Sequence, residues 1–491
     1  MSKDKESKVK ELETSLSECS GETDTTGFNE LQIVARSLAY SPVNKLHDGE
    51  NDIKVKDSTL GQFARLFERF DKRDFRISKF FAGYKHQSLY AFLTPYRNGV
   101  LQYVLSDFLE LKGYKILQTM SSAYADEEET KVAEIKCDVD ETFNVYLDAT
   151  ILCYNPENEG RICIEITLDQ HRGGVSLMIF FNDIAKNFWS EWQEYGKKKN
   201  FYKGKKINAM CDFLELNKEI TWEDVIVQDK IRNKIKQNVE NLFTYIDILQ
   251  KNKVTVKRGV ILAGPPGVGK TLICKVLIQA IKDITVLYVL PSHLKSAMDV
   301  SMVCEMARDL SPTLMVIEDI DFLAESRNTN PFGGLTVELM NQMDGVESFD
   351  GVVTLATTNM PEKIEEAIKN RPGRFDRVIQ VDLPDSKDRL KMLKKFTQRF
   401  ILKDVDLESI AEECNDMSGA YIYNLCETAA ICAVDENSID KDEKIIINSK
   451  HLKEAIAEIK DKDFSQWANT ERSGGFGFGK KGEDVPEEPY D

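Results

Sequence analysis

The sequence predicts an α/β fold with a parallel sheet and a small helical subdomain, preceded by a separate α+β domain. Apolar runs of strand length alternate with helical patterns over residues 218–385, which is typical of a parallel sheet with crossover helices. Residues 386–470 show helical periodicity alone, for example at 390–396. Before residue 218, helical patterns at 60–70 and 96–111 precede alternating apolar segments, which gives this region a mixed character.

Strand patterns are clearest in the second half of the α+β domain. Residues 143–152 and 161–168 alternate apolar and polar side chains around a turn at 155–158, and we expect a third strand at 175–181. We find no catalytic constellation in this domain.

Composition and pattern divide the chain into five segments. Both ends are predicted to be disordered, because one is charged and rich in Ser and Thr, and the other combines Gly and Phe repeats with acids. The segments are an acidic N-terminus at 1–27, the α+β domain at 28–217, the large α/β subdomain at 218–385, the helical subdomain at 386–470 and a flexible tail at 471–491.

Composition also limits the function classes. The 491 residues carry a net charge of −17, which argues against a general nucleic-acid binder. An aromatic and basic run at 188–206 leaves single-stranded nucleic acid or a protein partner open, although a solvated linker end explains it more simply. Ten cysteines without a C-x-x-C pair indicate reduced thiols rather than a disulfide framework or a zinc site. Because no apolar run reaches the length of a membrane span and the N-terminus is polar, we expect a cytoplasmic protein.

A phosphate-binding loop lies at 264–271, GPPGVGKT, and matches G-x-x-x-x-G-K-[ST] at every fixed position. An apolar run leads into the loop and a helical pattern leads out, which is the strand–loop–helix context that the motif requires. Glycines let backbone N–H groups turn onto phosphate oxygens, and the helix start adds partial positive charge. Lys270 would then reach the β- and γ-phosphates, and the Thr271 hydroxyl would hold Mg²⁺.

Polar side chains follow two further apolar strands. Residues 313–317 run into Glu318 and Asp319, of which one acid should position Mg²⁺ and the other should polarise the attacking water. Residues 352–358 run into Asn359, whose amide could orient that water. Further along, the arginines of 371–377 could neutralise charge in the transition state or form surface salt bridges.

These four elements, in this order, resemble the AAA module of the AAA+ ATPases over residues 218–465. The resemblance extends to 339–345, the helix and Asp-Gly turn before the sensor strand, and to the sensor segment at 356–361. Residues 371–377, RPGRFDR, resemble the second region of homology, and 418–420 resemble the lid segment that touches the nucleotide.

The resemblance implies the roles of individual residues. Glu318 and Thr271 would hold Mg²⁺, Asp319 would be the catalytic acid, and Asn359 would be the sensor. Arg374 and Arg377 would be arginine fingers that act on the ATP of a neighbouring subunit, which implies a ring, most often a hexamer. The residues implied to bind the nucleotide are Asp224, Val225, Gly264, Pro265, Pro266, Gly267, Val268, Gly269, Lys270, Thr271, Leu272, Gly419 and Ala420.

Three departures from the family pattern affect the expected activity. The acid pair reads Glu318-Asp319 where Asp then Glu is usual, an order similar to that in the AAA ATPases that assemble respiratory complex III. The pore-loop region at 291–298 has no aromatic residue, and His293 and Leu294 are the nearest candidates for its role. Residues 226–227, Ile-Val, replace the glycines that commonly follow the Asp-Val dipeptide.

We therefore expect an ATP-hydrolysing, chaperone-like AAA protein that remodels or disassembles protein complexes, with the α+β domain binding a client or adaptor. The acid order and the pore loop leave open a slow regulatory or scaffolding ATPase. A nucleic-acid-directed ATPase is less favoured by the net charge. A membrane-anchored protease of the FtsH type is excluded by the lack of a membrane span and of H-E-x-x-H.

Overall fold

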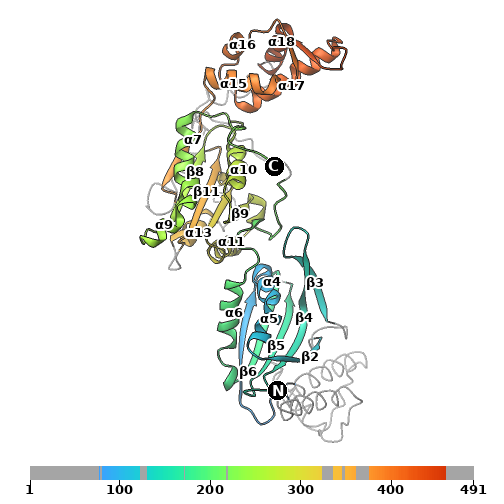
Figure 1. Ribbon diagram of the computed structural model, residues 1–491, viewed down its shortest axis with the longest axis vertical. Coiled ribbons are helices and arrows are strands. Elements are labelled where there is room, and N and C mark those ends of the chain that lie inside the picture. The colour runs from blue at the N-terminus through green and yellow to red at the C-terminus, as the bar shows by residue number, and fades with distance from the viewer. Residues whose placement is uncertain are drawn as a thin grey trace, which may run out of the picture. The chain divides into compact units, whose positions relative to one another are not determined.

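The computed structural model divides into two compact units between Tyr202 and Lys203 (Figure 1). It describes residue 77 and residues 80–121, 130–170, 172–216, 219–322, 335–344, 349–360 and 375–460. Within these residues, no helix is both long enough and apolar enough to cross a membrane. The predicted helix at 60–70 lies outside the described residues.

The first unit is an antiparallel sheet with helices packed on one face. The strands follow the order β1 (His86–Leu93), β6 (Gly174–Asn182), β5 (Arg161–Asp169), β4 (Thr142–Tyr154) and β2 (Lys115–Met120), and β3 (Lys131–Lys136) also pairs with β4. All three strands expected from the alternating pattern are present. Helices α4 (Pro95–Tyr103), α5 (Leu105–Leu111) and α6 (Phe188–Lys198) share a core with the sheet (Figure 1).

Four of the six aromatic residues of the run at 188–206 belong to this core or pack against it. Phe188, Trp192 and Tyr202 are buried, and Trp189 and Tyr195 pack against the same cluster. The Trp192 indole Nε1 donates a hydrogen bond to the Leu101 carbonyl at 3.0 Å. These rings therefore stabilise the unit and are not presented for stacking on bases.

The second unit is built on a wholly parallel sheet. The strands follow the order β12 (Arg377–Gln380), β8 (Lys257–Ala263), β11 (Val352–Thr358), β10 (Thr313–Ile317), β9 (Thr285–Val289) and β7 (Lys206–Asn208). The chain passes from β8 across to β9, returns through β10 to β11, and then crosses to β12 on the other side of β8. The carboxyl ends of β8, β11 and β10 therefore meet at one edge, where ligands bind in such sheets.

Helices of the large subdomain cover this sheet (Figure 1). The helices after the loop and the strands are α10 (Lys270–Ala280), α11 (Ala297–Asp309), α13 (Leu335–Asp344) and the short η4 (Pro291–His293). Those before β8 are α7 (Asp229–Ile235), η3 (Lys236–Glu240), α8 (Asn241–Thr244) and α9 (Ile246–Lys251). Buried side chains of α7, η3 and α10 share one apolar core with β8, β10 and β11.

The boundary between the units lies earlier than the 217/218 boundary expected from the sequence. Strand β7 pairs with β9, Lys206 opposite Val286, so the segment after Lys203 is part of the second unit. With only 3 residues, β7 is too short to show a strand pattern.

A helical subdomain completes the second unit. It contains α15 (Ser386–Thr397), α16 (Leu407–Glu413), α17 (Gly419–Asp435) and α18 (Ser449–Ile459), which enclose a core of their own. The helical pattern is thereby confirmed, while the short parallel pair β13 (Ile401–Lys403) and β14 (Ile446–Asn448) is an addition. We call this subdomain the lid.

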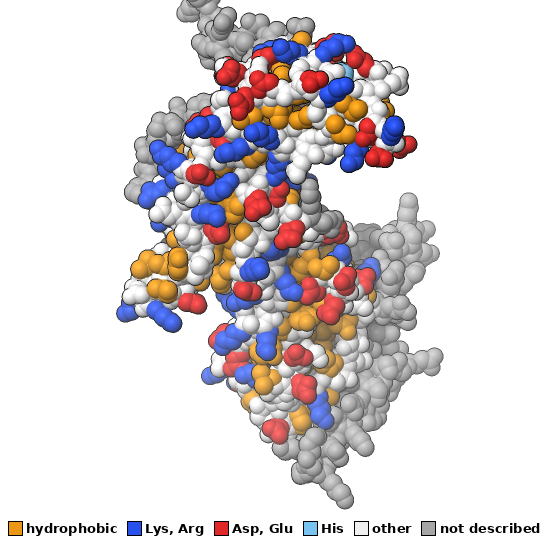
Figure 2. Space-filling model, turned by 45° about the horizontal axis from the view of Figure 1, so that its top comes forward, with side chains coloured by type: hydrophobic (Ala, Val, Ile, Leu, Met, Phe, Trp, Pro, Cys, Tyr) orange, Lys and Arg blue, Asp and Glu red, His pale blue; other side chains and the backbone are white. Residues whose placement is uncertain are grey.

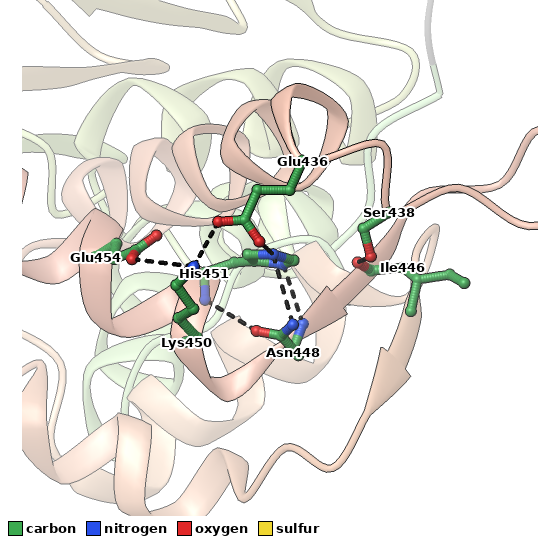
Figure 3. Close-up of polar contacts among 7 residues, drawn as sticks. All are labelled: Glu436, Ser438, Ile446, Asn448, Lys450, His451 and Glu454. Atoms are coloured by element: carbon green, nitrogen blue, oxygen red, sulfur yellow. Dashed lines mark hydrogen bonds and ion pairs between the residues drawn. The ribbon is translucent and has the colours of Figure 1, made fainter.

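A buried histidine joins the end of α17 to the start of α18 (Figure 3). The ring of His451 is fully buried; its Nδ1 accepts from the Asn448 backbone N–H at 3.3 Å, and its Nε2 lies 3.1 Å from Glu436 Oε2. Because Nδ1 is an acceptor here, Nε2 carries the proton and donates to the carboxylate. Hydrogen bonds from Lys450 first and then from His451 lower the pKa of Glu436.

Candidate active site

The loop at 264–271 connects β8 to α10 and depends on its glycines. Gly267 and Gly269 have φ of +78° and +97°, in the left-handed region that glycine adopts without strain. At Gly264 a Cβ atom would lie 2.1 Å from the Val381 carbonyl oxygen. The loop can therefore hold its backbone N–H groups inward only with these residues.

Lys270 sits at the centre of the site with 6% of its surface exposed. Its Nζ donates to the carbonyls of Gly264 at 2.7 Å and Pro265 at 2.8 Å, and to Asn359 Oδ1 at 2.8 Å. Burial lowers the pKa of Lys270, and the nearby charges of Asp319 and Asp321 oppose that shift. A phosphate would fit this ammonium, because charged oxygens are stronger acceptors than the neutral ones that it contacts.

Glu318, directly after β10, and Thr271, in the first turn of α10, bring two side-chain oxygens together. Thr271 Oγ1 donates to Glu318 Oε2 at 3.0 Å, and Glu318 is buried with 7% exposed. Its other oxygen, Oε1, is buried without a partner at hydrogen-bond geometry. An uncompensated buried carboxylate oxygen beside a hydroxyl fits a hard cation such as Mg²⁺.

Protein side chains alone do not complete a metal cage here. Among the described residues, no group of three or more His, Cys, Asp or Glu is arranged to hold a metal ion. Mg²⁺ commonly takes one or two protein ligands and fills its other positions with phosphate oxygens and water. The two ligands therefore suit a metal that arrives with a nucleotide.

Asp319 lies beside this pair and faces the end of β11. Its backbone has φ of +48°, its N–H donates to Thr357 Oγ1 at 2.9 Å, and Asn359 Nδ2 donates to its Oδ1 at 3.2 Å. Burial first, and then the charge of Asp321, raise the pKa of Asp319, while Lys270 opposes the shift. Lys270, Asn359 and Asp319 thus form one continuous hydrogen-bonded chain.

Two further residues hold the hydrogen-bonded series Lys270–Asn359–Asp319 in place, and neither was among the site residues expected from the sequence. Asp321 is buried and accepts from the Asn359 N–H at 3.3 Å. Thr357 holds the backbone of Asp319, as given above. A third acid two residues after Asp319 was visible in the sequence, but its link to Asn359 depends on how β10 and β11 are paired.

Only one of the two expected arginine fingers can be placed. Arg374 lies outside the described residues. Arg377 begins β12, is exposed, and donates through Nη1 to the Asp376 carbonyl at 3.0 Å. Asp376 is held in turn by Arg258 Nη1 at 2.7 Å.

The lid contacts the phosphate loop directly. The Ala420 N–H at the start of α17 donates to the Gly267 carbonyl at 3.0 Å. Gly419 lies close to the same carbonyl, and a Cβ there would come within 3.4 Å of it. Gly419 and Ala420 therefore lie beside the phosphate loop, and their contact with a nucleotide stays a prediction.

A pocket with a mainly apolar lining lies between the loop and the lid; Asp224 and Val225 directly precede its lining residue Ile226 in sequence but do not line it. Asp224 is paired with Lys395 of α15, Nζ to Oδ1 at 2.9 Å, and Val225 is buried in the core. Of the expected nucleotide-binding residues, Val268 does line the pocket. The lining residues are Ile226, Val227, Gln228, Ile231, Val268, Asp382, Leu383, Pro384, Asp388 and Met392.

Most of these pocket residues were not predicted. Ile226 and Val227 follow the Asp-Val dipeptide, and their apolar character is the one signal that the sequence offered. Met392 comes from the lid, so its approach to the pocket depends on the tertiary fold.

The pore-loop candidates form a tight turn after β9. His293 Nδ1 accepts from the Leu290 N–H at 3.1 Å, and Leu294 is buried. Burial lowers the pKa of His293. Leu294 is therefore packed into the subdomain instead of projecting from it.

Two family models match the second unit. Residues 260–383 match the family described as ATPase family associated with various cellular activities (AAA), and residues 404–466 match the AAA+ lid domain. A proteasome-activating nucleotidase from Methanococcus maripaludis (strain C7) is 33% identical over 273 residues, which is 53% of this chain and 65% of the relative. The ATPase family gene 2 protein of Schizosaccharomyces pombe is 31% identical over 261 residues, 52% of this chain and 32% of that protein.

A solved katanin structure shares 26% identity with this chain, with a TM-score of 0.40, over 48% of this chain and 84% of that one. The chain thus spans just under two thirds of the length of the archaeal relative and about a third of the yeast one.

Proposed function

The chain belongs to the AAA+ ATPases, and from this premise we propose that it binds and hydrolyses ATP with Mg²⁺ to remodel or disassemble protein complexes. The observation that carries the proposal is the hydrogen-bonded chain from Lys270 through Asn359 to Asp319, next to the Glu318–Thr271 pair. Together these groups provide an ammonium group that can bind phosphate, a position for a metal ion and a carboxylate that can act as a base, all at the edge of one sheet.

The chemistry follows from where these groups lie. Lys270 and the loop N–H groups would neutralise the phosphates, and Thr271 and Glu318 would hold a Mg²⁺ ion, which would supply further charge stabilisation to the transferred phosphoryl group. Asp319 accepts hydrogen bonds from an attacking water, and Asn359 holds both Asp319 and that water in orientation. The raised pKa of Asp319 brings it closer to that of a general base working near neutrality.

A closed homo-oligomeric ring, most often a hexamer, is part of the proposal. Arg377 is exposed at the start of β12 and can reach outward to a neighbour's nucleotide, as the family resemblance implies. The first unit has a core of its own and is proposed to bind the protein client or adaptor. On the face shown in Figure 2, Lys and Arg side chains are interspersed with Asp and Glu, which offers little support for nucleic acid as that partner.

We place the protein in the cytoplasm. Most of the cysteines in the described residues are buried as free thiols, as expected in a reducing compartment.

Steady-state ATP hydrolysis tests the proposal. Lys270→Ala should abolish nucleotide binding and turnover, whereas Asp319→Asn should bind Mg·ATP and fail to turn over. Lys275→Ala is the matched control, since Lys275 is an exposed lysine of the same helix. No turnover in the wild-type protein, or full turnover in Lys270→Ala, would refute the proposal.

A slow nucleotide-dependent switch is the second candidate. The observation that favours it is the acid order, because Asp319 is one methylene shorter than the glutamate usual at its position. A double variant, Glu318→Asp with Asp319→Glu, should then turn over at least tenfold faster than the wild type. An unchanged or lower rate would favour the first proposal, ATP-driven remodelling of protein complexes.

A further inference from the structure

The segment 221–228, which leads into α7, forms part of the wall of the pocket between the phosphate loop and the lid. Ile226 and Val227 line that pocket, together with Val268 of the loop and Met392 of the lid. The segment contains a turn but neither helix nor strand. Contacts with other elements must therefore fix the position of this wall.

One set of contacts holds the segment on the large subdomain. The Trp222 indole Nε1 donates to Glu240 Oε2 at 3.0 Å. The Val225 carbonyl accepts from Arg232 Nη2 at 2.9 Å, and the Val225 side chain is buried in the apolar core of the large subdomain. Val227 packs against the same core. These contacts leave the residues between Trp222 and Val225, and the residue between Val225 and Val227, to other partners.

A second set of contacts holds the same segment on the lid. Lys395 of α15 donates through Nζ to the Glu223 carbonyl at 2.9 Å and to Asp224 Oδ1 at 2.9 Å. The Ile226 side chain packs against the apolar core of the lid. The segment therefore connects the large subdomain to the lid, and Lys395 supplies two hydrogen bonds of that connection.

Asp224 is held in position to receive Lys395. Its other oxygen, Oδ2, accepts from the Thr221 N–H at 2.9 Å and from Thr221 Oγ1 at 3.3 Å. The hydrogen bond from the Thr221 backbone first, and then that from Lys395, lower the pKa of Asp224, so its carboxylate is charged at neutral pH. A charged donor that meets a fixed carboxylate and a carbonyl orients the segment more strongly than a neutral donor would.

We propose that Lys395 is a positioning residue for nucleotide binding, because its ammonium group holds the segment 221–228 so that Ile226 and Val227 form the wall of the base pocket. Since Lys395 belongs to the lid, that wall is complete only when the lid lies where the structure has it. A base in the pocket then favours this lid position, whereas a ligand that occupies the phosphate loop alone does not. This inference rests on the proposed function, because it assumes that the base of a bound nucleotide enters this pocket.

Lys395→Met removes the ammonium group and keeps the apolar part of the side chain. Isothermal titration calorimetry of the full-length protein with Mg²⁺ measures the affinity for ADP and, separately, for inorganic pyrophosphate, which has neither base nor ribose. The Lys395 and Asp224 side chains are 34% and 39% exposed, so we expect ADP affinity to fall only about 5-fold. Pyrophosphate affinity should stay at the wild-type value.

Lys394→Met is the matched control for this measurement. Lys394 is an exposed lysine of the same helix, and its replacement should change neither affinity. Wild-type ADP affinity in Lys395→Met, or an equal fall in the affinity for pyrophosphate, would overturn the inference.

Hydrogen–deuterium exchange tests the position of the segment directly. In the nucleotide-free protein, the amides of residues 221–228 should exchange faster in Lys395→Met than in Lys394→Met, because the hydrogen bonds to the lid are lost. A double-mutant cycle with Asp224→Asn tests the route, and the two losses of ADP affinity should be less than additive. Equal exchange in the two lysine variants, or fully additive losses, would contradict the positioning role.

Failure of this inference can be told apart from failure of the proposed function. If Lys270→Ala binds ADP as well as the wild type does, the proposed function fails and the inference with it. If Lys270→Ala loses ADP binding while Lys395→Met keeps wild-type ADP affinity, the inference alone is refuted.

Discussion

The contact between the phosphate loop and the lid leads to a prediction about Gly267. A Cβ atom at Gly267 would lie 2.6 Å from Ser418 Oγ and 2.8 Å from Ala420 Cβ, both in the lid. Either distance is shorter than ordinary van der Waals contact. Gly267→Ala should therefore push the start of α17 away and stretch the hydrogen bond from the Ala420 N–H to the Gly267 carbonyl, now 3.0 Å.

Two contributions set the size of the effect. An alanine in the left-handed region costs about 1 kcal/mol, and the weakened hydrogen bond costs about 1 kcal/mol more. Gly204 supplies the matched control: its φ is +75°, close to the +78° of Gly267, and a Cβ there would meet nothing within 4 Å. Gly204→Ala should show the backbone cost alone.

Urea unfolding of the full-length, nucleotide-free protein measures both. Gly267→Ala should lower the free energy of unfolding of the second unit by about 2 kcal/mol and Gly204→Ala by about 1 kcal/mol. Affinity for ADP should fall in Gly267→Ala and stay at the wild-type value in Gly204→Ala. Equal losses of stability in the two variants, with equal ADP affinity, would refute the loop–lid contact as described.

Two further predictions concern the lid histidine and the catalytic acid. His451→Ala should lower the stability of the lid by about 2–3 kcal/mol, because it removes a fully buried ring together with its hydrogen bonds. Lys450→Ala, at the exposed pair with Glu436, should have a clearly smaller effect. Thermal denaturation compares the two variants, and equal effects would contradict the role of the ring in joining α17 to α18 (Figure 3). The pKa of Asp319 is raised in the folded protein. The Asp319 carboxyl group therefore contributes to stability below its pKa in the unfolded chain, about 3.9. That contribution is lost as the pH rises through the pKa of Asp319 in the folded protein. Asp319→Asn should therefore melt at a higher temperature than wild type at pH 7, with a difference that shrinks toward pH 4, and a difference that grows on acidification would show the opposite sign of the shift.

The parts of the site that are contiguous in sequence could be predicted. Lys270 and Thr271 fall in one motif, and Glu318 and Asn359 each follow an apolar strand whose carboxyl end must face ligands in a parallel sheet. Their placement at one edge follows from the strand order, with β11 between β8 and β10.

The parts that depend on register or on a distant element could not be predicted. Tyr288 lies opposite Val316 because β9 pairs with β10 in one register, and a shift by one residue would turn it to the other face. Met392 reaches the pocket from the lid, and Asp224 pairs with Lys395 of the same helix. No local pattern encodes such pairs, because each partner looks like an ordinary residue of its own strand, turn or helix.

The pairing of β12 with β8 has a mechanical consequence for the proposed ring. Arg377 stands opposite Val260, on the strand that leads into the phosphate loop, so the two segments are separated by one interstrand spacing of about 4.8 Å. A rigid-body shift of β8 upon loss of phosphate would carry β12 with it through shared backbone hydrogen bonds. In the proposed ring, the sheet of each subunit would then link its own phosphate loop to the arginine that is proposed to act on the neighbour's nucleotide.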